Sequence, residues 1–199
     1  MLPKNYGMIT GWCTYEKAYA LMNLVHESHA KLSVELGVFG GRSLVAIGIA
    51  AKKVDPSSKV IGIDPWQAEA SLEGTNDKAN DDWWASVNYD EIYTYAKNLM
   101  IDNKVDSVVE LWRCKSRDTV SKFEDHSIDV LHQDSNHSEE ISCEEVELYW
   151  NKVRPGGFWV FDDTDWPTTK KAQDLLVSKG YRVLEVSSDN KWTVFKRND

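Results

Sequence analysis

The feature that most constrains the fold of this chain is the regular alternation of strand-like and helix-like segments along its 199 residues. Short apolar runs that end in polar residues alternate with longer stretches whose apolar residues recur at helical spacing. The expected strands are residues 31–37, 59–65, 108–113, 128–134, 158–163, 181–186 and 191–196. The expected helices are residues 14–30, 43–53, 90–103, 118–123, 138–153 and 168–179. The run Pro155-Gly156-Gly157 is expected to be the turn that ends the helix before it.

This alternation predicts βαβ units with right-handed crossovers, and therefore an α/β fold. We expect a Rossmann-like, seven-stranded and mostly parallel sheet, with helices on both faces and a C-terminal antiparallel hairpin. The sequence has no internal repeat or composition shift, so residues 1–199 are expected to form a single domain, with an N-terminal helix within residues 1–30. Residues 66–89 interrupt the alternation, because they are polar and aromatic with weak periodicity. A connection of this length beside the carboxyl end of a strand predicts a substrate lid.

Composition and charge narrow the class of partner. The chain carries 23 Lys and Arg against 32 Asp and Glu, a net charge of −9, and it has no basic run. This balance argues against a nucleic acid or an anionic membrane surface as the partner. The longest apolar stretch, residues 44–51, is far shorter than the ~20 residues that span a bilayer, and the N-terminus lacks the apolar core of a signal peptide. The three cysteines (Cys13, Cys114 and Cys143) include no Cys-x-x-Cys pair, which predicts reduced thiols in a cytoplasmic protein.

The first two strands end in residues that suit a nucleotide-like ligand. The first strand leads from Glu35 into a turn with Gly37 and Gly41 and then a helix beginning near Ser43. Glycines let a backbone approach a ligand closely, and a helix N-terminus offers free N–H groups to an anion. The second strand ends in Asp64, which can accept hydrogen bonds from both ribose hydroxyls. The alternative to a ligand-binding role is that the glycine turn is only structural and that Asp64 only caps a turn.

The fourth and fifth strands end in acids. Asp134 ends the fourth strand, and Asp162 and Asp163 end the fifth. Neighbouring strands lie ~4.8 Å apart, so these carboxylates should crowd together and repel one another unless a cation or a proton lies between them. Hard oxygen ligands suit Mg²⁺ or Ca²⁺, although Asp162 and Asp163 can share an ion only if the strand stops there. Solvated strand-end acids are the alternative.

A histidine and several tryptophans flank these acids. His137 follows Asp134 by three residues, and an imidazole, which titrates near neutrality, is a candidate general base. A helix-capping histidine is the alternative role. Four tryptophans lie near the expected strand ends, and their flat faces suit a sugar ring or an adenine as well as packing of the lid. They are Trp66, Trp83, Trp84 and Trp166.

These motifs together resemble those of class I S-adenosylmethionine-dependent methyltransferases. The segment from Val34 to Ser43 is similar to their first motif, and Gly62-Ile63-Asp64 to the second. Residues 109–116, 129–137 and 154–163 are similar to the later strand motifs, so the resemblance runs from about residue 31 to the C-terminus. Within the class, Asp134-x-x-His137 with Asp162-Asp163 resembles the macrocin-type, metal-dependent sugar O-methyltransferases. That branch usually has Asp-Gly-Asp-His where this chain has Asp134-Ser135-Asn136-His137, so one acid is lost, and this chain is also short.

The resemblance implies a set of site roles. S-adenosylmethionine would lie over the first two strand ends, beside Glu35, Gly37, Gly41, Ser43, Asp64 and Ser116. Asp134, Asp162 and Asp163 would hold Mg²⁺, and His137 would take the proton of an acceptor hydroxyl. The expected acceptor is a sugar or another small polyhydroxylated compound, and the oligomeric state stays open. The alternatives are a metal-independent methyltransferase and a catalytically silent cofactor-binding module. A dehydrogenase is disfavoured, because Phe39 interrupts the dinucleotide-type glycine turn.

Overall fold

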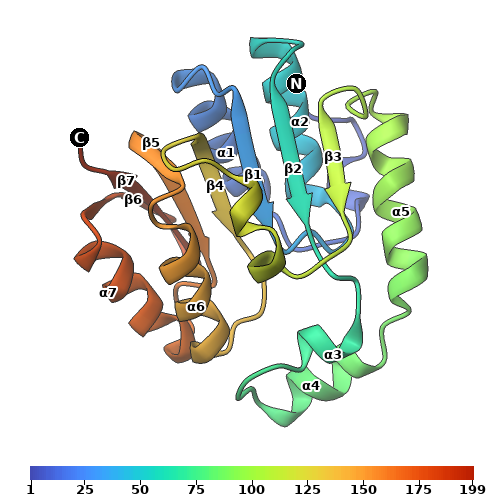
Figure 1. Ribbon diagram of the computed structural model, residues 1–199. Helices are drawn as coiled ribbons and strands as arrows, with labels where there is room; N and C mark the ends of the chain where they lie inside the picture. Colours follow the sequence, from blue (N-terminus) through green and yellow to red (C-terminus); the bar gives the residue numbers. More distant parts are fainter.

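The computed structural model describes residues 1–199 and contains one seven-stranded sheet with the order β3-β2-β1-β4-β5-β7-β6 (Figure 1). The strands are β1 (Leu32–Leu36), β2 (Lys59–Ile63), β3 (Val109–Trp112), β4 (Ile128–Gln133), β5 (Val153–Asp162), β6 (Tyr181–Val186) and β7 (Trp192–Arg197). The first five strands pair in parallel, whereas β7 runs antiparallel to both β5 and β6. The predicted mostly parallel sheet with a C-terminal hairpin is therefore confirmed.

Helices cover both faces of the sheet (Figure 1). They are α1 (Tyr15–Glu27), α2 (Arg42–Val54), α3 (Ala68–Ser71), α4 (Lys78–Ala85), α5 (Tyr89–Asp102), α6 (Glu139–Tyr149) and α7 (Lys170–Ser178). One core cluster joins α1, α2 and α5 to one face of the sheet, and the other joins α6 and α7 to the opposite face. None of the helices combines the length and apolar character needed to cross a bilayer.

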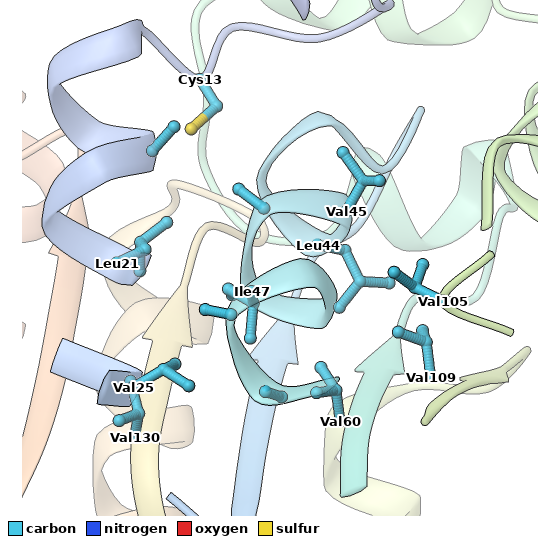
Figure 2. Close-up of a cluster of buried hydrophobic side chains, with 14 of the residues drawn as sticks. Cys13, Leu21, Val25, Leu44, Val45, Ile47, Val60, Val105, Val109 and Val130 are labelled. Atoms are coloured by element: carbon cyan, nitrogen blue, oxygen red, sulfur yellow. The ribbon is translucent and has the colours of Figure 1, made fainter. Parts of the chain in front are cut away.

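Helix α2 shows how the sequence pattern builds the core. Most residues of this helix are buried, and Leu44 and Ile47 are fully buried. They lie in one cluster with Val60 of β2 and Val130 of β4 (Figure 2). Burial of a side chain of this size stabilises the fold by about 1.5–3 kcal/mol. The packing of α2 over β1 and β2 brings the N-terminus of the helix to the carboxyl edge of the sheet.

The expected helix over residues 118–123 is wrong. The chain instead forms two 3₁₀ turns, Ser116–Asp118 and Val120–Lys122. The carbonyl of Ser116 accepts hydrogen bonds from both the backbone N–H and the hydroxyl of Thr119, at 3.0 and 2.8 Å. The buried Tyr149 hydroxyl donates to the same carbonyl at 2.8 Å. These contacts hold the chain in turns that close over three residues rather than four.

The role expected for Pro155-Gly156-Gly157 is also wrong. Helix α6 ends at Tyr149, and these three residues lie inside β5 instead. They form an irregular bulge there, because Val153 pairs with Ile128 while the next pair joins Phe158 to Val130. Proline cannot donate to a ladder, so a bulge is the position in a strand where it is tolerated.

Candidate active site

A cavity of about 740 Å³ opens at the carboxyl edge of the sheet. It lies where the strand order reverses between β1 and β4, the position at which open α/β sheets bind ligands. Its walls come from the segment before α1, the β1–α2 turn, residues 66–89, and the loops after β3, β4 and β5. Nearly all the predicted site residues lie on this wall; Glu35 and Gly41 lie behind it.

Asp64 organises the turn after β1. Its Oδ2 accepts hydrogen bonds from the backbone N–H groups of Val38 and Phe39, at 3.0 and 2.9 Å. Its Oδ1 accepts from the N–H of Trp66 at 2.6 Å. Burial raises the pKa of Asp64 although these three N–H groups oppose the shift. The carboxylate therefore links the ends of β1 and β2 beside the cavity.

The two glycines of the turn both have a backbone conformation that favours glycine, and Gly37 also lies against another segment of backbone. Gly37 has φ of +83°, and a Cβ there would lie 2.0 Å from the carbonyl oxygen of Asp134. Gly41 also has φ of +83° and precedes α2, and its Cβ would lie 2.9 Å from Cε of Met100. No side chain caps the N-terminus of α2, so N–H groups there stay free for a ligand.

Glu35 and Ser43 form a buried polar contact beneath the turn. Ser43, on the cavity wall, donates its hydroxyl hydrogen bond to Oε1 of Glu35, which is fully buried. His132 of β4 lies opposite Glu35 in the sheet, with Nδ1 3.3 Å from the same oxygen. Burial raises the pKa of Glu35, and His132 and Ser43 oppose the shift. Glu35 thus supports the site from behind the cavity.

Ser116 lies on the cavity wall and is held by an acid that sequence reasoning missed. It donates a hydrogen bond of 2.7 Å to Oε1 of Glu145 in α6. Ser135 donates to the other oxygen of Glu145, and so does the side chain of Gln133 at 3.0 Å. Glu145 is buried and joins the loops after β3 and β4. No sequence signal marks it, because α6 carries several other glutamates.

A lysine from α1 pairs with two of the predicted metal ligands. Lys17 Nζ donates to Oδ2 of Asp162 and lies 3.4 Å from Oδ2 of Asp134. The Lys17 side chain is only 4% exposed. Although burial opposes it, Lys17 helps to hold the pKa of Asp134 below its usual range, while burial and Asp134 raise that of Asp162. The signal that could have found Lys17 is its place on the same buried helix face as Leu21 and Leu24.

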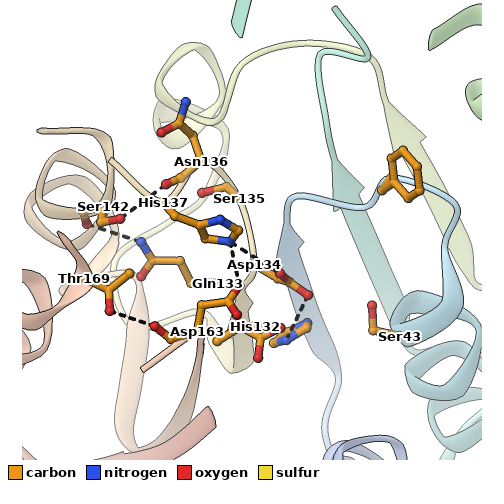
Figure 3. Close-up of polar contacts among 12 residues, drawn as sticks. Ser43, His132, Gln133, Asp134, Ser135, Asn136, His137, Ser142, Asp163 and Thr169 are labelled. Carbon is orange, nitrogen blue, oxygen red and sulfur yellow. Dashed lines mark hydrogen bonds and ion pairs between the residues drawn. The ribbon is translucent and has the colours of Figure 1, made fainter. Parts of the chain in front are cut away.

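His137 lies between Asp134 and Asp163 (Figure 3). Its Nε2 is 2.8 Å from Oδ2 of Asp163 and 4.0 Å from Oδ1 of Asp134. The indole of Trp166 covers the imidazole, with ring centroids 4.8 Å apart. Burial alone would lower the pKa of His137, but the two carboxylates outweigh it and raise that pKa to about 10. The imidazole is therefore held as a cation at neutral pH.

The end of β5 explains why the two neighbouring acids separate. The strand stops at Asp162, and Asp163 takes a left-handed conformation with φ of +49°. Asp162 then faces Lys17, whereas Asp163 faces His137. Groups able to offer ligand atoms to a metal form two clusters, His132–Asp134–Asp162 and Asp134–His137–Asp163, and no cluster contains all three acids. Because an ammonium already bridges Asp134 and Asp162, this arrangement does not fit a Mg²⁺ ion bound by all three acids.

A family model described as a methyltransferase domain matches residues 34–164, well over half of the chain. The chain belongs to this methyltransferase family. The matched range contains the β1–α2 turn, Asp64, the insertion at residues 66–89, His137 and all three acids. Among curated protein sequences, none matches the chain significantly.

Solved structures of similar fold include O-methyltransferases. The O-methyltransferase TomG from Streptomyces achromogenes, solved with S-adenosylmethionine, is 14% identical; the match covers 100% of this chain and 92% of that chain with a TM-score of 0.73. An O-methyltransferase from Bacillus cereus, solved with S-adenosylhomocysteine, is 11% identical, with coverage of 100% and 92% and a TM-score of 0.69. At these identities the likeness shows the fold, which is the Rossmann-like fold of these methyltransferases.

In this methyltransferase, Asn136 attaches the insertion to the site. Its Nδ2 lies within hydrogen-bond distance of the backbone carbonyls of Ala70, Ser71 and Glu73, at 3.2, 3.1 and 2.9 Å. An amide can donate to these carbonyls and a carboxylate cannot, so an asparagine at this position suits the docking of residues 70–73.

An aromatic cluster closes one side of the methyltransferase cavity. Trp12 stacks on Phe39 with centroids 5.1 Å apart, and Trp83 and Trp84 of α4 meet both rings edge-on or tilted. Sequence reasoning identified the α4 tryptophans but missed Trp12. Trp66 is fully buried, and its Nε1 donates to the Phe39 carbonyl at 2.9 Å, so it packs the core instead.

Proposed function

We propose that this methyltransferase transfers the methyl group of S-adenosylmethionine to a hydroxyl group of a small polyhydroxylated acceptor such as a sugar. The observation that carries the proposal is that His137, held by Asp163, lines the same cavity as the Gly37 turn and Asp64. The unpaired cysteines are compatible with the predicted cytoplasmic location. Magnesium assistance is left out of the proposal, because Lys17 bridges two of the acids it requires.

The residues on the β1 and β2 side of the cavity suit the cofactor. The free N–H groups at the start of α2, with Ser43 beside them, would hold its carboxylate, and Asp64 would accept from the ribose hydroxyls. Ser116, held by Glu145, would border the adenine. The cofactor supplies a methyl group on a sulfonium, which is a good leaving group, so the protein contributes mainly orientation and electrostatics.

The residues on the β4 and β5 side suit the acceptor. In its neutral form, which is a small fraction at pH 7 because the pKa is raised to about 10, His137 takes the proton of the hydroxyl as the oxygen–carbon bond forms and the sulfur–carbon bond breaks. Asp163 orients the imidazole and stabilises the imidazolium that results. The indole of Trp166 and the aromatic cluster offer flat apolar faces, while Asp134 and Asp163 offer acceptors for hydroxyl groups. This combination supports a sugar-like ring as the acceptor.

We expect S-adenosylhomocysteine to bind the purified protein in calorimetry, and Asp64→Ala to weaken this binding. Loss of the ribose hydrogen bonds should cost about 1–3 kcal/mol, a roughly 5- to 150-fold rise in Kd. Asp106→Ala is a matched control, because it removes an exposed acid at the opposite edge of the sheet. Equal Kd values for the Asp64 and Asp106 variants would remove Asp64 from the cofactor site.

We also propose that the moving part of the insertion is α4 rather than all of residues 66–89. Residues 70–75 are tied down by Asn136, by an ion pair from Glu73 to Arg117 and by hydrogen bonds from Thr75 to Glu140. In contrast, α4 has no buried residue, and its two tryptophans rest on Trp12 and Phe39. A helix with so few buried contacts opens at low free-energy cost.

Amide hydrogen exchange should separate the two parts of the insertion. We expect residues 78–85 to exchange quickly in the free protein and more slowly with S-adenosylhomocysteine bound, whereas residues 70–75 stay protected in both states. Asn136→Ala should make residues 70–75 exchange quickly as well. Slow exchange over α4 in the free protein would show that its tryptophans are ordinary packing and that α4 is not a lid.

A further inference from the structure

Lys17 is a buried cation, and the apolar packing of the sheet does not explain its presence. It lies on α1, a helix held by the burial of Leu21 and Leu24, and its side chain reaches the carboxyl edge of the sheet. There its ammonium contacts Asp162 and Asp134, which belong to two neighbouring strands. A buried lysine is costly unless it is paired, and here both partners are buried or partly buried acids. The ammonium therefore neutralises the two strand ends.

The ammonium also has a donor to spare. Lys17 Nζ carries three N–H groups, and its only hydrogen-bond acceptors in the protein are the carboxylates of Asp134 and Asp162. Lys17, Asp134 and His137 all line the cavity. The remaining N–H group is thus available to the oxygen of a molecule bound there, beside Asp134, whose other carboxylate oxygen lies 4.0 Å from Nε2 of His137.

We infer that Lys17 takes the place of a divalent cation in this site: its ammonium neutralises Asp134 and Asp162 and donates to the acceptor oxygen that His137 deprotonates. This inference rests on the proposed function. It gives Lys17 a direct contact with the reacting oxygen and makes methyl transfer independent of divalent metal. An ion at the same acids would face the ammonium at short range, and the repulsion between them would oppose its binding.

The experiment uses Mn²⁺ as a probe and measures its free concentration by electron paramagnetic resonance. The wild-type protein should bind no Mn²⁺ at these acids. Lys17→Met keeps a long apolar side chain but removes the charge, so we expect it to bind Mn²⁺ about 10²-fold more tightly or better. The double variant Lys17→Met/Asp162→Asn should lose this gain, because it removes one of the two carboxylates that Lys17→Met leaves without their ammonium partner.

Binding of S-adenosylhomocysteine is measured on every variant, since it reports folding and tests the proposed function separately. Tight Mn²⁺ binding by the wild-type protein would overturn the inference, whether or not the variants fold. A folded Lys17→Met protein that binds Mn²⁺ no better than the wild type would overturn it as well. Once an acceptor is identified, a chelator should leave the wild-type kcat unchanged, and its loss would contradict metal independence.

Discussion

Replacing His137 by alanine should slow methyl transfer by about 10²–10⁴-fold, the usual contribution of a positioned general base. Binding of S-adenosylhomocysteine should stay close to that of the wild type, because His137 follows β4 while the proposed cofactor residues follow β1, β2 and β3. Single-turnover transfer from a labelled methyl donor measures the rate. His26→Ala, at an exposed position of α1, is the matched control. A normal single-turnover rate in His137→Ala would exclude it as the base.

The pH profile tests the same role by its direction. Although burial favours the neutral ring, Asp134 and Asp163 raise the pKa of His137 to about 10, so only a small fraction is neutral at pH 7. The rate of the wild type should therefore rise with pH well beyond the neutral range that an isolated imidazole would give. Asp163→Asn removes one of the two acids that raise the pKa, and should move the profile to lower pH. A flat profile above neutrality would contradict this assignment.

Replacing Gly37 by alanine should destabilise the protein by about 2–5 kcal/mol. The first cause is the positive φ, which costs an L-residue roughly 1–2 kcal/mol. The second is the 2.0 Å approach of the new Cβ to the Asp134 carbonyl, an overpacking that typically costs about 1–3 kcal/mol. Urea unfolding measures the loss.

Gly180→Ala separates the two causes. Gly180 follows α7 with φ of +93°, and a Cβ there would meet no atom within 4 Å. This variant should therefore show only the conformational cost, about 1–2 kcal/mol. If both variants lost the same unfolding free energy, the loop after β4 would be able to move away from the added Cβ at little cost. A much larger loss of unfolding free energy in Gly37→Ala than in Gly180→Ala would confirm that Gly37 is needed for the close approach of the Asp134 backbone.

Much of the candidate site could be predicted because parallel strands share an edge. Asp64 and Asp134 follow β2 and β4, Asp162 ends β5, and the sheet brings their side chains around one cavity. The glycines of the first turn both have positive φ, and Gly37 admits the backbone of Asp134. Their close approach to a bound cofactor stays a prediction.

The partners of these acids could not be predicted from local pattern. Lys17 precedes Asp134 by 117 residues and Asp162 by 145, and they meet only because α1 packs across the sheet toward β4 and β5. Asp162 and Asp163 contact different partners because the strand stops between them, with φ of +49° at Asp163. A pattern of apolar residues indicates which face of a segment is buried, but it does not indicate which charged side chain of another segment packs against that face.

Periodicity and turn residues act over a few neighbours, so they were enough to predict the order of strands and helices, the Rossmann-like sheet and the edge at which the polar residues gather. The three-dimensional packing was needed to show that an ammonium bridges two of the acids, that Asn136 docks the insertion and that two carboxylates raise the pKa of His137. Each of these depends on desolvation and on charges brought together from distant segments. The electrostatics of the site therefore depend on how distant segments pack, and the local motif does not show whether a lysine or a metal ion neutralises the acids.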